Sequence, residues 1–219
     1  MFDAKRLLDQ LVGSGAAGGF AGGLAGGALA NMLSGKKGRK LAGSALQVGG
    51  LALVGGLAYK AWQSYQRGAM APSADGGMAP PPADGTFIPK ADDTAGTNAL
   101  SLLLARAMIA AAKADGQIDT QESQAILNQI NSLALPAEDK AFLFEEYGRP
   151  LEIEPLVRGV RSPEQAAEVY AASALMVEPP SAAEKIYLDT LANALGLEQG
   201  LVQQVHATLQ ADRMGGSAA

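Results

Sequence analysis

The sequence predicts an all-α protein, and three observations carry this prediction. From Thr97 onward, apolar residues recur with helical spacing, and no window alternates with a period of two. The chain ahead of this region is rich in glycine and alanine and holds two long stretches without a charged residue. A proline-rich segment separates the two regions. We therefore expect a helical bundle behind an N-terminal glycine-rich membrane segment and a flexible Pro/Ala/Gly linker.

Charge is distributed unevenly along the chain. Residues 1–71 hold eight Lys/Arg against two Asp, whereas residues 97–219 hold eight Lys/Arg against sixteen Asp/Glu. A basic N-terminal part suits an anionic membrane surface. The acidic C-terminal part argues against nucleic acid as a partner, because it would repel phosphates. The chain has no cysteine, which excludes disulfides, thiolate metal sites and cysteine nucleophiles.

Residues 1–67 are predicted to form the membrane anchor, with the best span at 41–59. This stretch carries no charge over 19 positions, and Tyr59 and Trp62 at its end suit the interfacial aromatic belt. A helix needs about 20 mostly apolar residues to cross the hydrocarbon layer. The alternative is a buried core helix, but no neighbouring element is expected to cover it.

A second stretch, 11–33, is uncharged over 23 positions and is a weaker candidate for a span. Its glycines form two ladders with a spacing of four residues, which on a helix leave a smooth face for close packing against another helix. This pattern predicts a homo-oligomer formed through the glycine-laddered helices. A flexible glycine-rich tract and a cleaved signal peptide are the alternatives. The ladders are Gly15, Gly19, Gly23 and Gly27, and Gly18, Gly22 and Gly26.

A basic loop, "SGKKGRK", separates the two uncharged stretches and is expected on the cytoplasmic side. The C-terminal domain then lies on the opposite, periplasmic side, whether the chain crosses once at 41–59 or twice as a hairpin. Residues 68–96 contain five prolines among glycine, alanine and aspartate. This composition cannot bury enough apolar surface to fold, so it predicts a flexible linker.

The helical domain is predicted over 97–212, within the usual size of a domain. A shift of 62 residues lays Glu122 on Glu184 and Leu133 on Leu195, which suggests two similar halves. The acidic residues at 145, 146, 152 and 154 are interpreted as a solvated face. The expected helices begin at Thr97 and near Thr120, and then run over 136–147, 162–177, 181–195 and 198–209.

The segment "AKADGQIDTQE" concentrates carboxylates around a glycine turn. The spacing of Asp115, Asp119 and Glu122 matches the second half of a calcium-binding EF-hand loop, and Glu184 is the fourth candidate ligand. Such a site would hold a divalent cation, with calcium, magnesium and manganese as the candidates. The alternative is structural: Asp119 caps the following helix, and Glu122 completes a capping box three residues later.

Two segments, "ARAMIAAAKADGQIDTQE" and "EVYAASALMVEPPSAAEKIYLDTLANALGL", resemble the TerB-like helical domain of tellurite-resistance proteins. With its glycine-rich, basic N-terminus, the whole chain is similar to bacterial inner-membrane proteins of the YebE family. The resemblance implies a compact bundle of about seven helices. It also implies an acidic surface suspected of binding divalent metal, here at Asp115, Asp119, Glu122 and Glu184. Related soluble TerB domains are cytoplasmic, so the side on which the domain lies stays open.

No nucleophile–base pair can be proposed from the sequence, so an enzyme is not expected. We expect a non-enzymatic inner-membrane protein whose helical domain binds an unknown protein partner, in envelope or metal stress. The alternative is a divalent-cation-binding stress sensor that uses the acidic turn at 115–122.

Overall fold

A computed structural model describes seven stretches of the chain: 3–13, 49–68, 81–82, 84–114, 130–131, 136–177 and 180–215. These residues form helices and no strand, which confirms the all-α class. The named helices are α1 (Ala4–Gly13), α6 (Gly50–Gln66), α7 (Thr94–Ala112), α9 (Ala137–Gly148), α10 (Glu154–Gly159), α11 (Pro163–Val177), α12 (Ala182–Ala194) and α13 (Gln199–Gly215).

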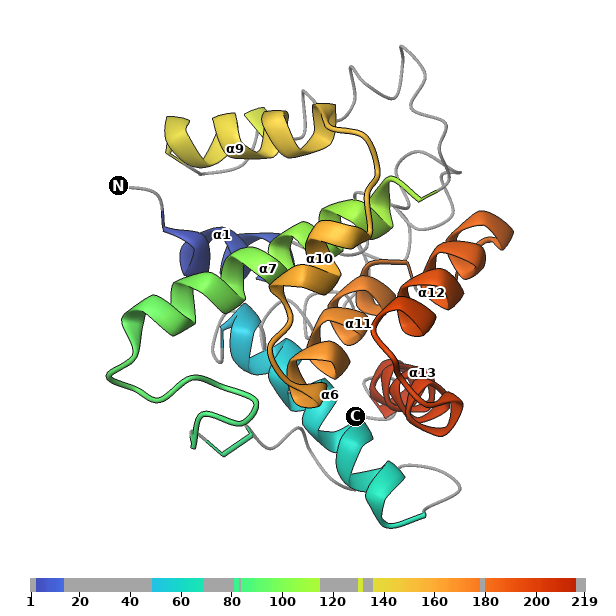
Figure 1. Cartoon of the computed structure of the whole chain (residues 1–219). Coiled ribbons are helices and arrows are strands. Elements are labelled where there is room, and N and C mark those ends of the chain that lie inside the picture. The colour runs from blue at the N-terminus through green and yellow to red at the C-terminus, as the bar shows by residue number, and fades with distance from the viewer. Residues whose placement is uncertain are drawn as a thin grey trace.

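Helix α7 lies at the centre of the bundle, with α11 and α1 as its main neighbours (Figure 1). It begins at Thr94, where the carboxylate of Asp93 accepts a hydrogen bond of 2.8 Å from the Gly96 amide. This contact satisfies one of the free N–H groups of the first turn. Of the described helices, α7 has the length and hydropathy of a membrane span. Half of that apolar window is buried by neighbouring helices, as in a core helix.

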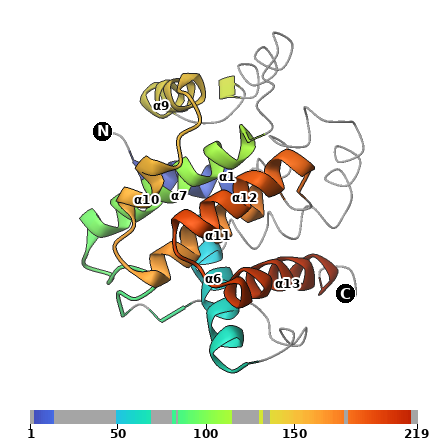
Figure 2. The same ribbon diagram turned by 45° about the vertical axis from the view of Figure 1, so that its right-hand side comes forward.

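Helix α6 contains most of the best predicted span and is a core helix in this fold. Leu51, Leu53, Val54 and Leu57 are buried, and α13, α11 and α1 pack around them (Figures 1 and 2). The expectation that no neighbouring element covers this segment is therefore wrong. The reason is physical: a helix that is apolar all round has one sequence pattern, whether it is buried in protein or in lipid.

Helix α1 belongs to the same core. Leu7, Leu8 and Leu11 are at most 2% exposed, and they pack on α7 and α6. Arg6 also reaches outward from α1, and its Nη2 lies 3.5 Å from the buried carboxylate of Asp139 on α9. Helix α1 thus packs as part of the helical domain.

The junction of α1 and α6 explains the two glycines at the start of α6. Gly49 has a φ of 82°, a backbone conformation that favours glycine. The carboxylate Oδ1 of Asp9 accepts a hydrogen bond of 2.7 Å from the Gly50 amide and so caps α6 from another helix. A Cβ atom at Gly50 would lie 2.8 Å from the backbone oxygen of Leu8. The two helices therefore meet backbone to backbone at this point.

Gly50→Ala is expected to destabilise the fold by about 1–3 kcal/mol, because the backbone of Leu8 has to move to admit the methyl group. Gly148→Ala is the matched control, since the helical Gly148 has no atom within 4 Å of such a Cβ. It should be neutral, or stabilising by up to about 1 kcal/mol. Thermal unfolding followed by circular dichroism measures both variants. Equal effects of the two changes would contradict the close approach of α1 and α6.

Part of the predicted linker folds onto the domain. Phe87 is 3% exposed, and its ring makes edge-to-face contacts with Tyr59 at 5.3 Å and Trp62 at 6.1 Å. The two aromatic residues expected at a membrane interface therefore hold Phe87 against α6. Burial of an aromatic ring contributes to the core much as an aliphatic side chain does.

The remaining helices lie close to their predicted positions. Helices α11, α12 and α13 begin within one residue of the expected starts, whereas the six-residue α10 was not predicted. The helix expected from Thr120 lies mostly outside the described residues; its two described residues, Ile130 and Asn131, are helical. Helices α7 and α11, which lead the two predicted halves, pack against each other. The duplication itself stays a prediction, and the glycine ladders lie outside the described residues.

Candidate functional site

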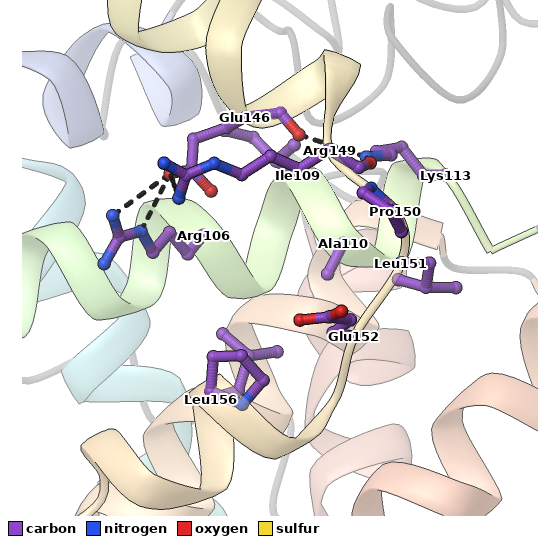
Figure 3. A pocket seen from close by; sticks show the side chains of 11 residues that line it. Arg106, Ile109, Ala110, Lys113, Glu146, Arg149, Pro150, Leu151, Glu152 and Leu156 are labelled. Atoms are coloured by element: carbon purple, nitrogen blue, oxygen red, sulfur yellow. Dashed lines mark hydrogen bonds and ion pairs between the residues drawn. The ribbon is translucent and has the colours of Figure 1, made fainter.

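A pocket of about 150 Å³ opens between α7 and the chain that runs from the end of α9 into α10 (Figure 3). Charged side chains from α7 and α9 form its upper side, and residues 149–152, which connect α9 to α10, form its edge. Its lining residues are Arg106, Ile109, Ala110, Lys113, Glu146, Arg149, Pro150, Leu151, Glu152, Pro155 and Leu156.

Glu146 joins two arginines at this pocket. Its Oε1 accepts hydrogen bonds from Nε and Nη2 of Arg106, at 3.2 and 3.0 Å, and lies 3.1 Å from Nη1 of Arg149. The Glu146 side chain is only 12% exposed, so water screens these charges weakly. Arg149 also pairs with Glu145, and the Arg106 guanidinium lies 5.7 Å from the centre of the Phe142 ring. The two guanidinium groups are thereby held in fixed positions.

Lys113 closes the other end of the pocket. Its ammonium donates to the backbone carbonyl of Glu146 at 3.0 Å and to that of Arg149. These carbonyls belong to the last turn and the end of α9, where backbone acceptors lack a partner within the helix. Burial lowers the pKa of Lys113, and the nearby charge of Glu146 opposes this effect. Lys113, which directly follows α7, therefore caps the C-terminal end of α9, and its ammonium loses part of its hydration.

The pocket gathers positive charge within an acidic domain. Three of the eight Lys/Arg in residues 97–219 line it, beside the carboxylates of Glu146 and Glu152. Guanidinium and ammonium groups are the side chains that bind carboxylates and other oxyanions most strongly. An arrangement of this kind can hold an anionic group in a defined orientation.

Sequence reasoning missed this pocket. It interpreted Glu145, Glu146, Glu152 and Glu154 as a solvated face, and for the nearly buried Glu146 this is wrong. A signal was present: Arg106 and Lys113 are seven residues apart and share one helix face, and the Glu145-Glu146 pair is followed by Arg149. Nothing in the sequence shows that these two helices meet.

Of the four predicted metal ligands, the structure describes one. Asp115, Asp119 and Glu122 lie outside the described residues. Glu184 sits at the third position of α12 and accepts a hydrogen bond of 2.6 Å from the Ser181 amide, while the Ser181 hydroxyl accepts one from the Glu184 amide. This is a complete capping box. Within the described residues, no three His, Asp or Glu side chains cluster as metal ligands would. The cation site stays a prediction.

Ser181→Ala is expected to lower the free energy of unfolding by about 1 kcal/mol, because the capping hydroxyl is lost. Glu184→Gln should change it less, since glutamine also completes a capping box. Thermal unfolding with and without millimolar calcium, magnesium or manganese measures both variants. A cation that stabilises the unmodified protein but not Glu184→Gln would instead assign Glu184 to metal binding.

Several polar groups in the interior hold helices together through hydrogen bonds. His206, the single histidine, lies 2.9 Å through Nε2 from the hydroxyl of Tyr170. The Ser173 hydroxyl donates to the backbone carbonyl of Ala107 at 3.2 Å and lies 3.3 Å from the hydroxyl of Tyr187. Burial raises the pKa of Tyr187 to about 12. These bonds join α7, α11, α12 and α13 through the interior.

Glu168 on α11 is an exception in the core. Its side chain is fully buried, and neither carboxyl oxygen has a hydrogen-bond partner. A Cβ atom at Gly55 of α6 would lie 3.2 Å from its Oε1, and it would also lie 3.3 Å from Ile88 and 3.4 Å from Pro81. Burial, with a smaller contribution from the charge of Glu164, raises the pKa of Glu168 to about 9. The group is therefore a neutral acid at physiological pH.

The fold and the pocket define an all-helical protein with a charged surface pocket. The chain belongs to the family described as "Protein of unknown function (DUF533)", whose model matches residues 18–209. It is also similar to an "Uncharacterized protein in ampR 5'region" of Yersinia enterocolitica, with 26% identity over 96 residues. This alignment covers 44% of the chain and 69% of that protein. No solved structure matches the chain.

Proposed function

We propose that the chain is a non-enzymatic protein of the bacterial inner membrane, whose helical domain docks a partner protein at the pocket beside α7. The pocket is the observation that supports this proposal, because its charged groups are fixed in place at the surface. Leu151 at its rim is 40% exposed, an unusual exposure for a large apolar side chain next to a charged pocket. Protein interfaces combine apolar contacts with hydrogen-bonded polar groups, and arginine is enriched in them.

A photo-crosslinking residue at position 151 tests this docking site in living cells. The matched control is position 186, because Ile186 is 69% exposed on α12, away from the pocket. We expect one defined protein to be crosslinked at 151 and not at 186. Ala110→Trp, which fills the pocket from α7, should abolish that product. Equal crosslinking at the two positions, or a product indifferent to Ala110→Trp, would contradict docking at the pocket.

Membrane attachment remains part of the proposal, and the resemblance to TerB-like proteins of the YebE family supports it. The uncharged sequence between α1 and α6 is its basis. Because α1 and α6 both pack on the domain, the chain between them leaves and returns on the same side. Residues 41–48 are also too few to cross a hydrocarbon layer of about 30 Å as a helix. We therefore favour attachment from one side over a single crossing.

The absence of cysteine makes this arrangement testable. Lys5→Cys on α1 and Arg158→Cys on α10 place single thiols at side chains that are 50% and 69% exposed. In spheroplasts treated with a membrane-impermeant maleimide, we expect both thiols to react or both to be protected. A single crossing between α1 and α7 would give opposite results at the two positions. Protection of both would place the domain in the cytoplasm, and reaction of both in the periplasm.

A further inference from the structure

We propose that the pocket beside α7 binds an acidic side chain, glutamate or aspartate, of the docked partner protein. This inference rests on the proposed docking function and names the chemistry that the partner presents. The pocket itself is lined by three basic residues, Arg106, Lys113 and Arg149, and by two carboxylates, Glu146 and Glu152. Glu145 pairs with Arg149 from outside this lining, and its side chain is 62% exposed, so a carboxylate that enters the pocket can take its place at Arg149.

The donors for such a carboxylate are present and positioned. A guanidinium has five N–H donors, and the described interactions with Glu145 and Glu146 use two on Arg106 and two on Arg149. Arg106 is 38% exposed and Arg149 is 52% exposed, so both remain accessible from solvent. Each guanidinium therefore has N–H donors beyond those used in these interactions, and a carboxylate that enters the pocket makes charge-assisted bonds to them.

The burial of Lys113 also favours a carboxylate in the pocket. Its ammonium is nearly buried, and the partners that the structure gives it are two backbone carbonyls. A buried ammonium is stabilised far more by a nearby negative charge than by neutral dipoles alone. An entering carboxylate offsets the lost solvation of Lys113, which the empty pocket leaves only partly balanced by Glu146.

The size of the pocket and the apolar part of its lining limit what enters. A volume of about 150 Å³ suits one side chain rather than a folded surface element. Ile109, Leu151 and Leu156 surround the charged groups and contact the methylene groups of a glutamate. The domain carries a net negative charge, whereas the pocket gathers three of its eight basic residues, so electrostatic attraction favours an acidic partner at this position. Charge thereby sets the position at which such a partner docks.

The test uses the purified full-length chain in detergent with two small probes, glutamate and glutamine blocked at both ends as amides. Nuclear magnetic resonance follows the arginine Nε–H signals and the ε-methylene signal of Lys113 at constant ionic strength. Blocked glutamate should shift these signals and raise the pKa of Lys113, whereas blocked glutamine should not. One charged contact of this kind predicts a Kd of about 1 mM.

Three variants separate binding from folding. Arg149→Ala should weaken binding of blocked glutamate at least tenfold, while the exposed Arg158→Ala should leave it unchanged. Glu146→Gln should strengthen binding, because it removes the internal carboxylate that competes for both arginines while its amide oxygen still accepts from Arg106. A purely structural cluster predicts no gain for Glu146→Gln. Thermal unfolding of each variant confirms that the fold is intact.

The outcomes distinguish this inference from the function on which it rests. Equal responses to glutamate and glutamine, or equal losses in Arg149→Ala and Arg158→Ala, would overturn the acidic ligand. If crosslinking at position 151 still yields a partner in that case, docking at the pocket stands and only its chemistry is wrong. If no partner is found either, the docking function fails as well.

Discussion

Glu168→Gln is expected to stabilise the protein by up to about 3 kcal/mol at pH 7 and by almost nothing near pH 4.5. The stabilisation arises because burial raises the pKa of Glu168 in the folded state to about 9, whereas the group titrates near 4.5 in the unfolded chain. Between these two values the folded protein keeps a proton that the unfolded chain releases. The free energy of unfolding therefore falls as the pH rises through this window, and the loss is complete above about pH 9.

Glutamine has nearly the same shape and no charge to lose, so the variant should lack this part of the pH dependence. Chemical denaturation at several pH values between 4.5 and 9 measures both proteins. Glu154→Gln is the control, because it makes the same change of residue at a side chain that is 79% exposed. Parallel stability curves for Glu168→Gln and the unmodified protein would contradict a neutral, buried Glu168.

Leu8→Ala is expected to destabilise the whole helical domain by about 2–5 kcal/mol, because it leaves a cavity between α1, α6 and α7. Leu8 is fully buried although it lies ahead of both uncharged stretches, in the part of the chain that the sequence assigns to the anchor. Thermal unfolding of the full chain followed by circular dichroism measures the loss.

Lys5→Ala is the matched control on the same helix. Its ammonium pairs with Asp9 at 2.8 Å on the surface, and an exposed pair four residues apart contributes about 0.3–0.5 kcal/mol. If α1 served only as part of an anchor, Leu8→Ala and Lys5→Ala would have equally small effects on the unfolding of residues 94–215. A large difference between them ties α1 to the core.

Helices with one apolar face could be predicted from the sequence. For helices that are apolar on all sides, the sequence does not show whether protein or lipid surrounds them. The pattern from Ser181 to Leu195 predicted α12 within one residue, because a capping residue and an apolar stripe mark its ends and its face. The uncharged run at 41–59 has no polar face, so its sequence fits both lipid and protein surroundings. The described part of this run, residues 49–59, belongs to α6 and its N-cap, and α6 packs against α13, more than 130 residues further along the chain.

The candidate site shows the same limit. The acidic turn at 115–122 was recognisable because its carboxylates are close in the sequence. The pocket depends on Arg106 and Glu146, which are 40 residues apart. Long-range ion pairs of this kind follow from how α9 lies on α7, and no local pattern records that orientation. The capping role of Glu184 was predicted only for its repeat partner Glu122.

The hydrogen bond by which Asp9 caps Gly50 joins two residues that are 41 positions apart in the sequence. The entropy lost on closing a flexible loop rises only with the logarithm of its length, so a twofold change in length alters stability by about 0.6 kcal/mol. Insertions and deletions between α1 and α6 should therefore be tolerated, provided that Asp9 and Gly50 still meet. The domain thus has a built-in insertion point between α1 and α6, where the length of the chain can change without loss of the fold.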